Sequence, residues 1–289
     1  MKKYLFVGNR VGVLKFLIES GYHIEKILIP TFNYVQTYLD KTGTKYEIFH
    51  NKNELLSKII NTDFDVLVSN GCPFILPVSQ LKKGHQIFVN IHPSYLPDLR
   101  GKSPINGAIL FNKDPGATCH IMDDDIDSGD IISQVKFHYS DDLDLGLLYK
   151  LCFIAEVDAF KEAIRVNFSP KKSQIIGENY IYFSSSHSDL LINFDDSAEK
   201  ICKQVKAFGV RSQGARFTFK NQEFIVLEAR VITNKYLLSK LDDYKNLQIA
   251  FIYDDNIVFR KDGKFVKFGK IIGKIHYLEE GDILKNEFK

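Results

Sequence analysis

Apolar runs alternate with amphipathic stretches along roughly the first 170 residues of this chain. The run at 3–8 ends at a glycine, and the following stretch repeats its apolar positions with the period of a helix until Gly21. Strands that alternate with helices at this spacing predict a parallel sheet with crossover helices. The predicted strands lie at 3–8, 25–30, 45–50, 63–71, 86–91, 116–124 and 134–139, and the predicted helices at 13–21, 33–43, 53–60, 103–112 and 145–164.

The pattern changes in the remainder of the chain. One amphipathic helix is predicted at 197–208, and the rest consists of short alternating segments separated by turns rich in Asp, Gly and Lys. Short strands at this spacing predict a small, open-barrel-like β domain. The expected organisation is an α/β domain with a Rossmann-like, mostly parallel sheet at 1–175 and a smaller β-rich domain at 176–289. The short strands are predicted at 215–220, 223–232, 247–253, 256–261 and 264–271.

The composition limits what the protein binds and where it works. The 289 residues are 45% hydrophobic and 26% charged, the balance of a globular protein that buries a core without disulfides or metals. The 38 basic and 36 acidic residues leave a net charge of +2, so no overall field attracts DNA or a membrane. The four cysteines form no C-x-x-C pair, which favours reduced thiols. The N-terminal apolar run is too short for a signal peptide or a spanning helix, so a cytoplasmic protein is expected.

The strand predicted at 86–91 runs into two polar residues, Asn90 and His92, followed by Pro93. Residues two apart on a strand point to the same side, so these side chains should face one space. Ligands collect at the carboxyl ends of the strands in such a sheet. An amide can donate a hydrogen bond to a developing oxyanion and an imidazole can move a proton, a combination that suits acyl transfer. The alternative is a pair of ordinary polar residues at a strand edge.

An acidic cluster at 122–130 offers a partner for the histidine. A calcium loop starting at Asp123 would place Ser128 where glycine is needed and Gln134 where glutamate is needed, so a calcium site is not expected. One aspartate beside the histidine could instead orient the imidazole and stabilise its cation. The other carboxylates, Asp124 among them, suit a solvated acidic loop.

Two motifs are similar to nucleotide-binding loops but depart from them. The stretch at 100–104 contains Gly-Lys-Ser, yet Leu96 occupies the position of the first glycine of a phosphate-binding loop. The stretch at 8–12 lacks the glycine spacing of a dinucleotide-binding turn. Basic residues before a predicted helix can still form an anion site, although surface solubility explains them equally well. The residues that could meet an anion at this sheet edge are Asn9, Arg10, Arg100 and Lys102.

The sequences at 90–110 and 116–132 together resemble the formyltransferase family that uses 10-formyltetrahydrofolate. The resemblance rests on Asn-x-His, on Ser-x-Leu-Pro-x-x-Arg-Gly-x-x-Pro and on Asp-x-Gly-Asp, and it covers the α/β half. It implies that the first domain has the formyltransferase fold and is catalytic, that Asn90, His92 and Asp127 carry the reaction, and that no metal is needed. It also implies a folate site formed by Pro73, Phe74, Ile75 and Leu76 and by the backbone of Met122, Asp123, Asp124 and Asp125.

The resemblance implies a mechanism as well. A neutral amine attacks the formyl carbon of the folate, and Asn90 and protonated His92 stabilise the resulting oxyanion. Asp127 holds His92 in place, and either His92 or Asp127 removes the amine proton. The β-rich domain resembles the smaller C-terminal domain of the family.

The identity of the amine depends on the segment after the second strand. The branch acting on initiator methionyl-tRNA carries a basic, glycine- and arginine-rich loop there, whereas residues 29–50 are short and aromatic, with Lys41 and Lys45 as their only lysines. The expected substrate is therefore a nucleotide-linked amino deoxysugar of the dTDP-linked kind, used for bacterial surface polysaccharide such as the O-antigen of lipopolysaccharide. Its diphosphate would meet the four anion-site residues. The residues that could stack on its base are Phe32, Tyr34 and Tyr38.

Other interpretations stay open. A methionyl-tRNA formyltransferase is favoured only weakly, by the locally basic segment at 261–270, and tRNA is not the expected partner. A non-catalytic folate-binding or assembly protein could share the fold, although retention of Asn90, His92 and Asp127 argues against it. A formyl-folate hydrolase would be expected to carry an N-terminal regulatory domain. The sequence leaves the oligomeric state open, with a homodimer as one expectation.

Overall fold

The computed structural model describes residues 2–175 and 177–287, and the chain divides into two compact units. Each unit is described by itself below. Within the described residues, no helix combines the length and apolar character needed to cross a membrane. The first unit comprises Met1–Ala108, Asp114–Tyr139 and Tyr149–Phe183, and the second comprises Ile109–Lys113, Ser140–Leu148 and Ser184–Lys289.

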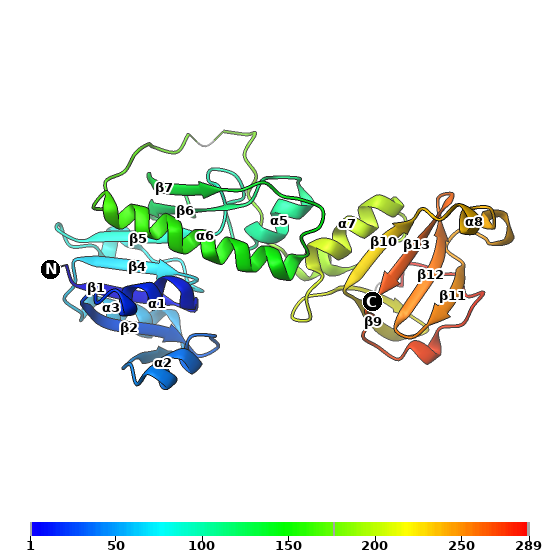
Figure 1. Ribbon diagram of the computed structural model, residues 1–289. Coiled ribbons are helices and arrows are strands. Elements are labelled where there is room, and N and C mark those ends of the chain that lie inside the picture. The colour runs from blue at the N-terminus through cyan, green and yellow to red at the C-terminus, as the bar shows by residue number, and fades with distance from the viewer. Residues whose placement is uncertain (1, 176, 288–289) are drawn as a thin grey trace. The chain divides into compact units, whose positions relative to one another are not determined.

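The first unit is built on the strands β1 (Tyr4–Gly8), β2 (Ile24–Pro30), β3 (Glu47–Phe49), β4 (Val66–Asn70), β5 (Ile87–His92), β6 (Gly116–Ile121) and β7 (Ile131–Lys136). They form one sheet in the order β3-β2-β1-β4-β5-β6-β7 (Figure 1). The pairs from β3 to β5 are parallel, whereas β6 and β7 are antiparallel additions at the edge. The prediction of a mostly parallel sheet is confirmed.

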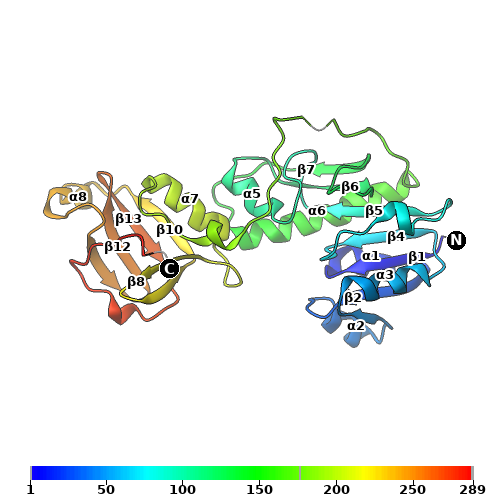
Figure 2. The same cartoon turned by 180° about the vertical axis from the view of Figure 1, so that it is seen from behind.

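The helices that accompany this sheet are α1 (Val11–Glu19), α2 (Gln36–Thr42), α3 (Lys52–Ile60), α4 (Val78–Leu81), α5 (Pro104–Leu110) and α6 (Leu145–Arg165). Side chains alternate across β1, so Phe6 points to one face of the sheet and Leu5 to the other, and both are fully buried. Residues of α1, α2 and α6 complete the core on the first face, and residues of α3 and α4 on the second. Figures 1 and 2 show these layers from opposite sides. Burial on both faces explains why the central strands are continuous apolar runs.

The second unit consists of α7 (Ala198–Phe208), α8 (Lys235–Leu238), β8 (Ala215–Phe219), β9 (Gln222–Val226), β10 (Glu228–Ile232), β11 (Ile249–Tyr253), β12 (Asn256–Lys261), β13 (Lys264–Gly269) and the 3-10 turns η1 (His187–Leu190), η2 (Leu241–Asp243) and η3 (Ile275–Tyr277). Four strands form an antiparallel sheet in the order β10-β13-β12-β11, and β8 and β9 form a hairpin. In the described residues these are open sheets and not a closed barrel. The prediction of a β-rich, open C-terminal domain is confirmed. Buried phenylalanine rings, such as Phe259 and Phe268 with centroids 4.8 Å apart, fill its core.

Some element boundaries differ from the prediction for local reasons. The helix expected at 33–43 begins at Gln36, because the side-chain oxygen of Asn33 accepts hydrogen bonds from the backbone N–H groups of Val35 and Gln36 and forms a turn there. The single strand expected at 223–232 is divided into β9 and β10, which belong to different sheets. Alternating hydrophobicity continues through this break, so periodicity alone does not reveal it.

Two adjacent isoleucines of α3 give a direct test of the packing. Ile59 is 1% exposed in the core and Ile60 is 51% exposed. We expect Ile59→Ala to lower the free energy of unfolding by about 2–5 kcal/mol, because it leaves a cavity, and Ile60→Ala to change it by less than about 0.5 kcal/mol. Urea unfolding followed by circular dichroism measures both. Equal effects of the two substitutions would contradict the assigned helix orientation.

Candidate active site

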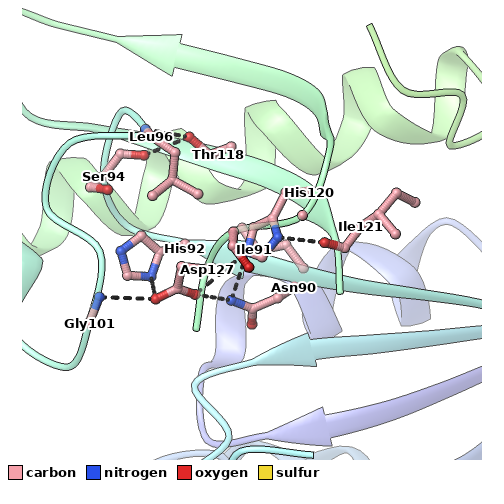
Figure 3. Close-up of polar contacts among 12 residues, drawn as sticks. Asn90, Ile91, His92, Ser94, Leu96, Gly101, Thr118, His120, Ile121 and Asp127 are labelled. Carbon is pink, nitrogen blue, oxygen red and sulfur yellow. Dashed lines mark hydrogen bonds and ion pairs between the residues drawn. The ribbon is translucent and has the colours of Figure 1, made fainter. Parts of the chain in front are cut away.

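Asn90 and His92 lie at the carboxyl end of β5, and both side chains reach Asp127 (Figure 3). The amide nitrogen of Asn90 lies 3.2 Å from Oδ1 of Asp127, and Nδ1 of His92 lies 3.4 Å from its Oδ2. One carboxylate can contact both residues because side chains two apart on a strand point to the same side. The structure thus brings together the three residues that the sequence singles out for catalysis.

His92 is 5% exposed and both of its ring nitrogens have partners. Nε2 lies 2.9 Å from the backbone oxygen of Leu99, and because a carbonyl oxygen can only accept, Nε2 carries the proton of this hydrogen bond. Nδ1, which faces Asp127, is therefore the nitrogen whose protonation can change. Burial lowers the pKa of His92 below its ordinary value, against the opposing charge of Asp127. At neutral pH His92 is a buried neutral imidazole.

Asp127 has an unusual backbone conformation and a fully engaged carboxylate. Its φ of 52° lies in the left-handed region, which non-glycine residues adopt infrequently. Oδ2 accepts a hydrogen bond from the backbone N–H of Gly101 at 3.0 Å, and Oδ1 accepts one from Asn90. Burial alone would raise the pKa of Asp127, but His92, His120 and the Gly101 N–H together hold that pKa well below its usual range. The group is a carboxylate at neutral pH.

His120 is a member of the site that the sequence analysis missed. Antiparallel pairing of β5 with β6 places it directly opposite Asn90. Its Nδ1 donates to the backbone oxygen of Ile121 at 2.7 Å, so Nε2 can accept from the amide of Asn90 at 3.3 Å (Figure 3). Nε2 also lies 3.6 Å from Oδ1 of Asp127. Only knowledge of the strand pairing could have revealed this residue, since thirty positions separate it from Asn90.

The loop that follows β5 is anchored by Thr118 of β6. The hydroxyl of Thr118 donates to the backbone oxygen of Ser94 at 2.7 Å and accepts from the N–H of Leu96 at 3.1 Å (Figure 3). A buried hydroxyl that both donates and accepts holds two points of the loop at once. The residues that follow, Leu99 and Gly101, are the ones that contact the histidine and the aspartate.

The first predicted folate segment lies after β4 and is partly core. Leu76 is 1% exposed and belongs to the hydrophobic core beneath α3 and α4, so its side chain offers no open surface. Phe74 is half-buried against the same core, with its ring centroid 6.0 Å from that of Phe49. Pro73 and Ile75 are exposed, Ile75 by 54%. The segment therefore presents an apolar edge formed by Pro73, Phe74 and Ile75.

The second predicted folate segment lies after β6 and is joined to the first. Met122 is half-buried against the same core cluster as the 73–76 segment. Asp124 accepts a hydrogen bond from the backbone N–H of Ser79, at the start of α4, at 3.0 Å. Asp123 accepts from the N–H of Asp125 at 3.2 Å and so stabilises its own turn. In the described part of the chain, no three His, Cys, Asp or Glu side chains are grouped so that they could hold a metal ion.

Arg10 is engaged inside the first unit. Its guanidinium forms an ion pair with Glu156 of α6, which is 1% exposed, and lies 4.9 Å from the ring centroid of Phe153. Burial raises the pKa of Glu156 to about 7, although Arg10 and a hydrogen bond from Asn70 oppose this shift. The amide nitrogen of Asn70 also lies 3.4 Å from the backbone oxygen of Ile91, which connects the pair to β5.

The other predicted anion-site residues lie in two places. Asn9 follows β1, and its side-chain oxygen occupies the space that a Cβ at Gly71 would need. Arg100 is half-buried in the loop after β5, and its Nε is buried with no hydrogen-bond partner among the described residues. Lys102 is exposed in the same loop. Arg100 and Lys102 therefore share a loop with the groups that hold His92 and Asp127, whereas Asn9 and Arg10 lie at the end of β1.

Comparison with protein families agrees with this fold. A model described as formyl transferase matches residues 30–164, and a model described as formyl transferase, C-terminal domain, matches residues 185–274. The two matches together span well over half of the chain. The chain belongs to the formyl transferase family.

Curated relatives include methionyl-tRNA formyltransferases. The one from Orientia tsutsugamushi is 30% identical over 188 residues, which are 64% of this chain and 61% of that relative. The one from Bacillus mycoides is 28% identical over 166 residues, 52% of this chain and 53% of that relative. The chain thus spans between about half and three fifths of the length of these curated relatives.

Solved structures with the same fold include sugar N-formyltransferases. WlaRD, a sugar 3N-formyl transferase solved with dTDP and 5-N-formyl-THF, superposes with a TM-score of 0.70 at 20% identity and covers 93% of this chain and 97% of that one. The N-formyltransferase of Helicobacter canadensis, in complex with folinic acid and dTDP-3-aminofucose, gives a TM-score of 0.69 at 17% identity and covers 93% of this chain and 99% of that one. At these identities the superpositions establish the fold.

The buried carboxyl group of Glu156 predicts a pH dependence of stability. Its pKa rises from 4.5 to about 7 on folding, so the stability that this group contributes is complete below pH 4.5 and is lost as the pH rises through about 7. The expected loss is on the order of 3 kcal/mol, and Glu156→Gln should remove this part of the slope. Urea unfolding between about pH 5 and pH 8 measures it. Glu19→Gln, on the exposed side of α1, is the control, and an unchanged slope in Glu156→Gln would contradict the burial of an ionisable carboxyl group.

Proposed function

We propose that this protein transfers the formyl group of 10-formyltetrahydrofolate to the amino group of a nucleotide-linked amino sugar. The observation that supports it most is the contact of Asn90 and His92 with one buried carboxylate, Asp127, at the carboxyl end of β5 in a chain of the formyl transferase family. Such an arrangement holds an amide donor, a proton acceptor and a charge that stabilises the acceptor's cation within one site.

The surface formed by residues 73–75 and 122–125 has the chemical character needed to bind a folate. Phe74 and Met122 are half-buried on one core cluster, and exposed Pro73 and Ile75 extend the apolar edge on which a flat ring can lie. The turn at Met122 to Asp125 presents backbone groups for the polar edge of such a ring. Bound in this place, 10-formyltetrahydrofolate supplies the formyl carbon to the reaction. Leu76 supports the segment from within the core.

Asn90 acts as the donor to the formyl oxygen, where negative charge develops as the amine attacks. Its contacts with Asp127 and His120, at 3.2 and 3.3 Å, orient the amide, and release of the longer contact frees an N–H for the oxyanion. Because Asp127 already orients the amide before the amine attacks, release of this one contact is the only reorganisation that the donor needs.

His92 takes the proton of the attacking amine and can return it to the leaving nitrogen of the folate as the formyl carbon–nitrogen bond breaks. Its pKa is lowered by burial, so the ring is neutral at neutral pH, and Nδ1 is the unprotonated nitrogen because Nε2 donates to Leu99. Once protonated, the ring would have an acceptor at each nitrogen, the Leu99 oxygen and the Asp127 carboxylate. Asp127 is a weak base since its own pKa lies well below the usual range, so it serves as the group that holds and stabilises the imidazolium.

A nucleotide-linked sugar suits the surroundings of the site better than a tRNA. Arg100 carries a buried Nε without a partner in the described structure, and Lys102 is exposed in the same loop, which fits a diphosphate. Phe32 and Tyr34 are 91% and 82% exposed after β2, where a base could stack. The solved relatives with dTDP or dTDP-3-aminofucose favour a dTDP-linked amino sugar, of the kind used for surface polysaccharide such as O-antigen.

Methionyl-tRNA is the second candidate acceptor, because the curated relatives carry that name. A protein that binds tRNA depends on many phosphate contacts and therefore on a strongly basic surface. The chain has a net charge of only +2, and residues 29–50 contain no arginine and only two lysines, Lys41 and Lys45. Both observations argue against tRNA as the acceptor.

Removal of the oxyanion donor Asn90 or of the base His92 should nearly abolish turnover. We expect Asn90→Ala and His92→Ala each to lower kcat by about 10²–10³, because a lost oxyanion donor or base raises the barrier without changing the fold. Initial rates of formyl transfer measure the effect, and circular dichroism confirms folding. His85→Ala, at an exposed position before β5, is the control and should keep wild-type turnover. Wild-type rates in either site variant would overturn the assignment.

The acceptor can be identified with a defined panel. The protein is incubated with 10-formyltetrahydrofolate and thymidine-, uridine- or guanosine-diphosphate amino sugars, or with methionyl-tRNA, and a mass gain of one formyl group is sought. We expect a dTDP-linked amino sugar to react, with Arg100→Ala raising its KM about tenfold or more through loss of a charge-assisted hydrogen bond, and Lys52→Ala on α3 as the control. Formylation of methionyl-tRNA alone would replace the sugar assignment.

A further inference from the structure

A segment after α6 forms hydrogen bonds with both loops that hold the site, the one that carries Asp127 and the one that follows β5. We call residues 171–175 and 177–183 the strap. They belong to the first unit and run past the edge strand β7, on its side away from β6 (Figures 1 and 2). Near its start, the backbone N–H of Ile131 donates to the oxygen of Lys172 at 2.9 Å, and the N–H of Lys171 donates to the oxygen of Ile131 at 2.8 Å. The strap is thereby paired with the first residue of β7, directly after the loop that carries Asp127.

Gln174 connects the strap to the backbone of the catalytic aspartate. Its amide nitrogen donates to the backbone oxygens of Asp127 at 3.1 Å and Gly129 at 2.7 Å. Its own oxygen is buried and has no hydrogen-bond partner among the described residues. A buried acceptor without a partner is unfavourable, so this amide is not placed there for stability alone.

The backbone that Gln174 holds is under constraint. Asp127 has a φ of 52°, and a Cβ at Gly129 would lie 2.0 Å from the backbone oxygen of Ile121. A left-handed aspartate persists only where its surroundings fix it. The two hydrogen bonds from Gln174 supply such a restraint on the peptide that sets the direction of the carboxylate.

The other end of the strap holds the loop after β5. The N–H of Arg100 donates to the oxygen of Ile181 at 3.2 Å, and the N–H of Phe183 donates to the oxygen of Arg100 at 2.8 Å. Arg100 stands between Leu99 and Gly101, whose backbone groups contact the histidine and the aspartate of the site. The strap is therefore hydrogen-bonded to the backbone between the two residues that contact His92 and Asp127.

From this arrangement we infer that the strap is a positioning device for the His92–Asp127 pair, with Gln174 as the positioning residue at the Asp127 end. The hydrogen bonds of Gln174 go to backbone oxygens of the Asp127 loop, so it acts by fixing the carboxylate against Nδ1 of His92. The kinetic part of this inference rests on the proposed formyl transfer. The geometric part concerns the coupling of His92 to Asp127 and can be measured without any substrate.

The substitution Gln174→Leu removes both donated hydrogen bonds at nearly constant size. We expect kcat to fall roughly ten- to a hundredfold, as for a small misplacement of a catalytic group, with KM for the formyl donor unchanged. The midpoint of the His92 titration, followed by NMR of protein with labelled histidine, should move to lower pH, because Asp127 is the group that favours the cation. The other titratable groups that act on His92 are His120 and Arg10, whereas the side-chain hydrogen bonds of Gln174 go to the backbone oxygens of Asp127 and Gly129.

A second glutamine provides a matched control. Gln204 of α7 also donates from its amide nitrogen to two backbone oxygens, those of Asp189 and Leu191, each at 2.9 Å, within the second unit. Gln204→Leu removes the same kind of contacts within the other unit. It should leave kcat and the His92 titration unchanged, although it costs a similar pair of hydrogen bonds.

The outcomes separate the inference from the proposed function. Wild-type kcat and an unchanged His92 titration in Gln174→Leu would overturn the role of the strap. If Gln174→Leu does not fold, Gln174→Asn, which keeps the amide on a shorter side chain, takes its place under the same two criteria. If the wild-type protein formylates nothing, the proposed function fails, and the His92 titration alone decides the inference.

Discussion

The rest of the site depends on the contacts that the buried carboxylate of Asp127 makes with the groups around it. A charge whose side chain is only 11% exposed is stable only when donors and potential cations surround it. Asp127 obtains them from β5 through Asn90 and His92, from β6 through His120, and from the loop after β5 through Gly101. A shift of any one of these elements would remove part of the set of partners around this charge, so the carboxylate couples the edge of the sheet to two loops.

The change from parallel to antiparallel pairing at β5 makes this arrangement possible. A parallel neighbour would enter beside the amino end of β5, whereas β6 runs back from its carboxyl end and brings His120 and Thr118 beside Asn90 and His92. Thr118 then anchors the loop after β5, and that loop returns to the pair. On the opposite neighbour of β5, Asn70 of β4 connects the strand to the buried Arg10–Glu156 pair.

The residues proposed for the chemistry and those proposed for acceptor binding lie in different parts of the molecule. The His–Asp pair and its donors are buried and mutually constrained, which suits a reaction common to a whole family. The residues proposed to bind the acceptor, such as Phe32, Tyr34 and Lys102, are exposed and lie in loops. Loops can change without disturbing a core, so relatives with one fold can act on a tRNA or on a sugar nucleotide.

The sequence by itself determined the order of elements in the first unit, the open β-rich character of the second, and the shared side of Asn90 and His92. These features depend on the local period of side chains along a strand or helix, which the sequence displays directly. It did not reveal His120, the engagement of Arg10 by Glu156, the core position of Leu76 or the contact of Gln174 with Asp127. Each of these was decided by tertiary structure, because each joins segments far apart in the chain. The residues that meet in the folded protein depend on strand pairing and on packing, which no local pattern encodes.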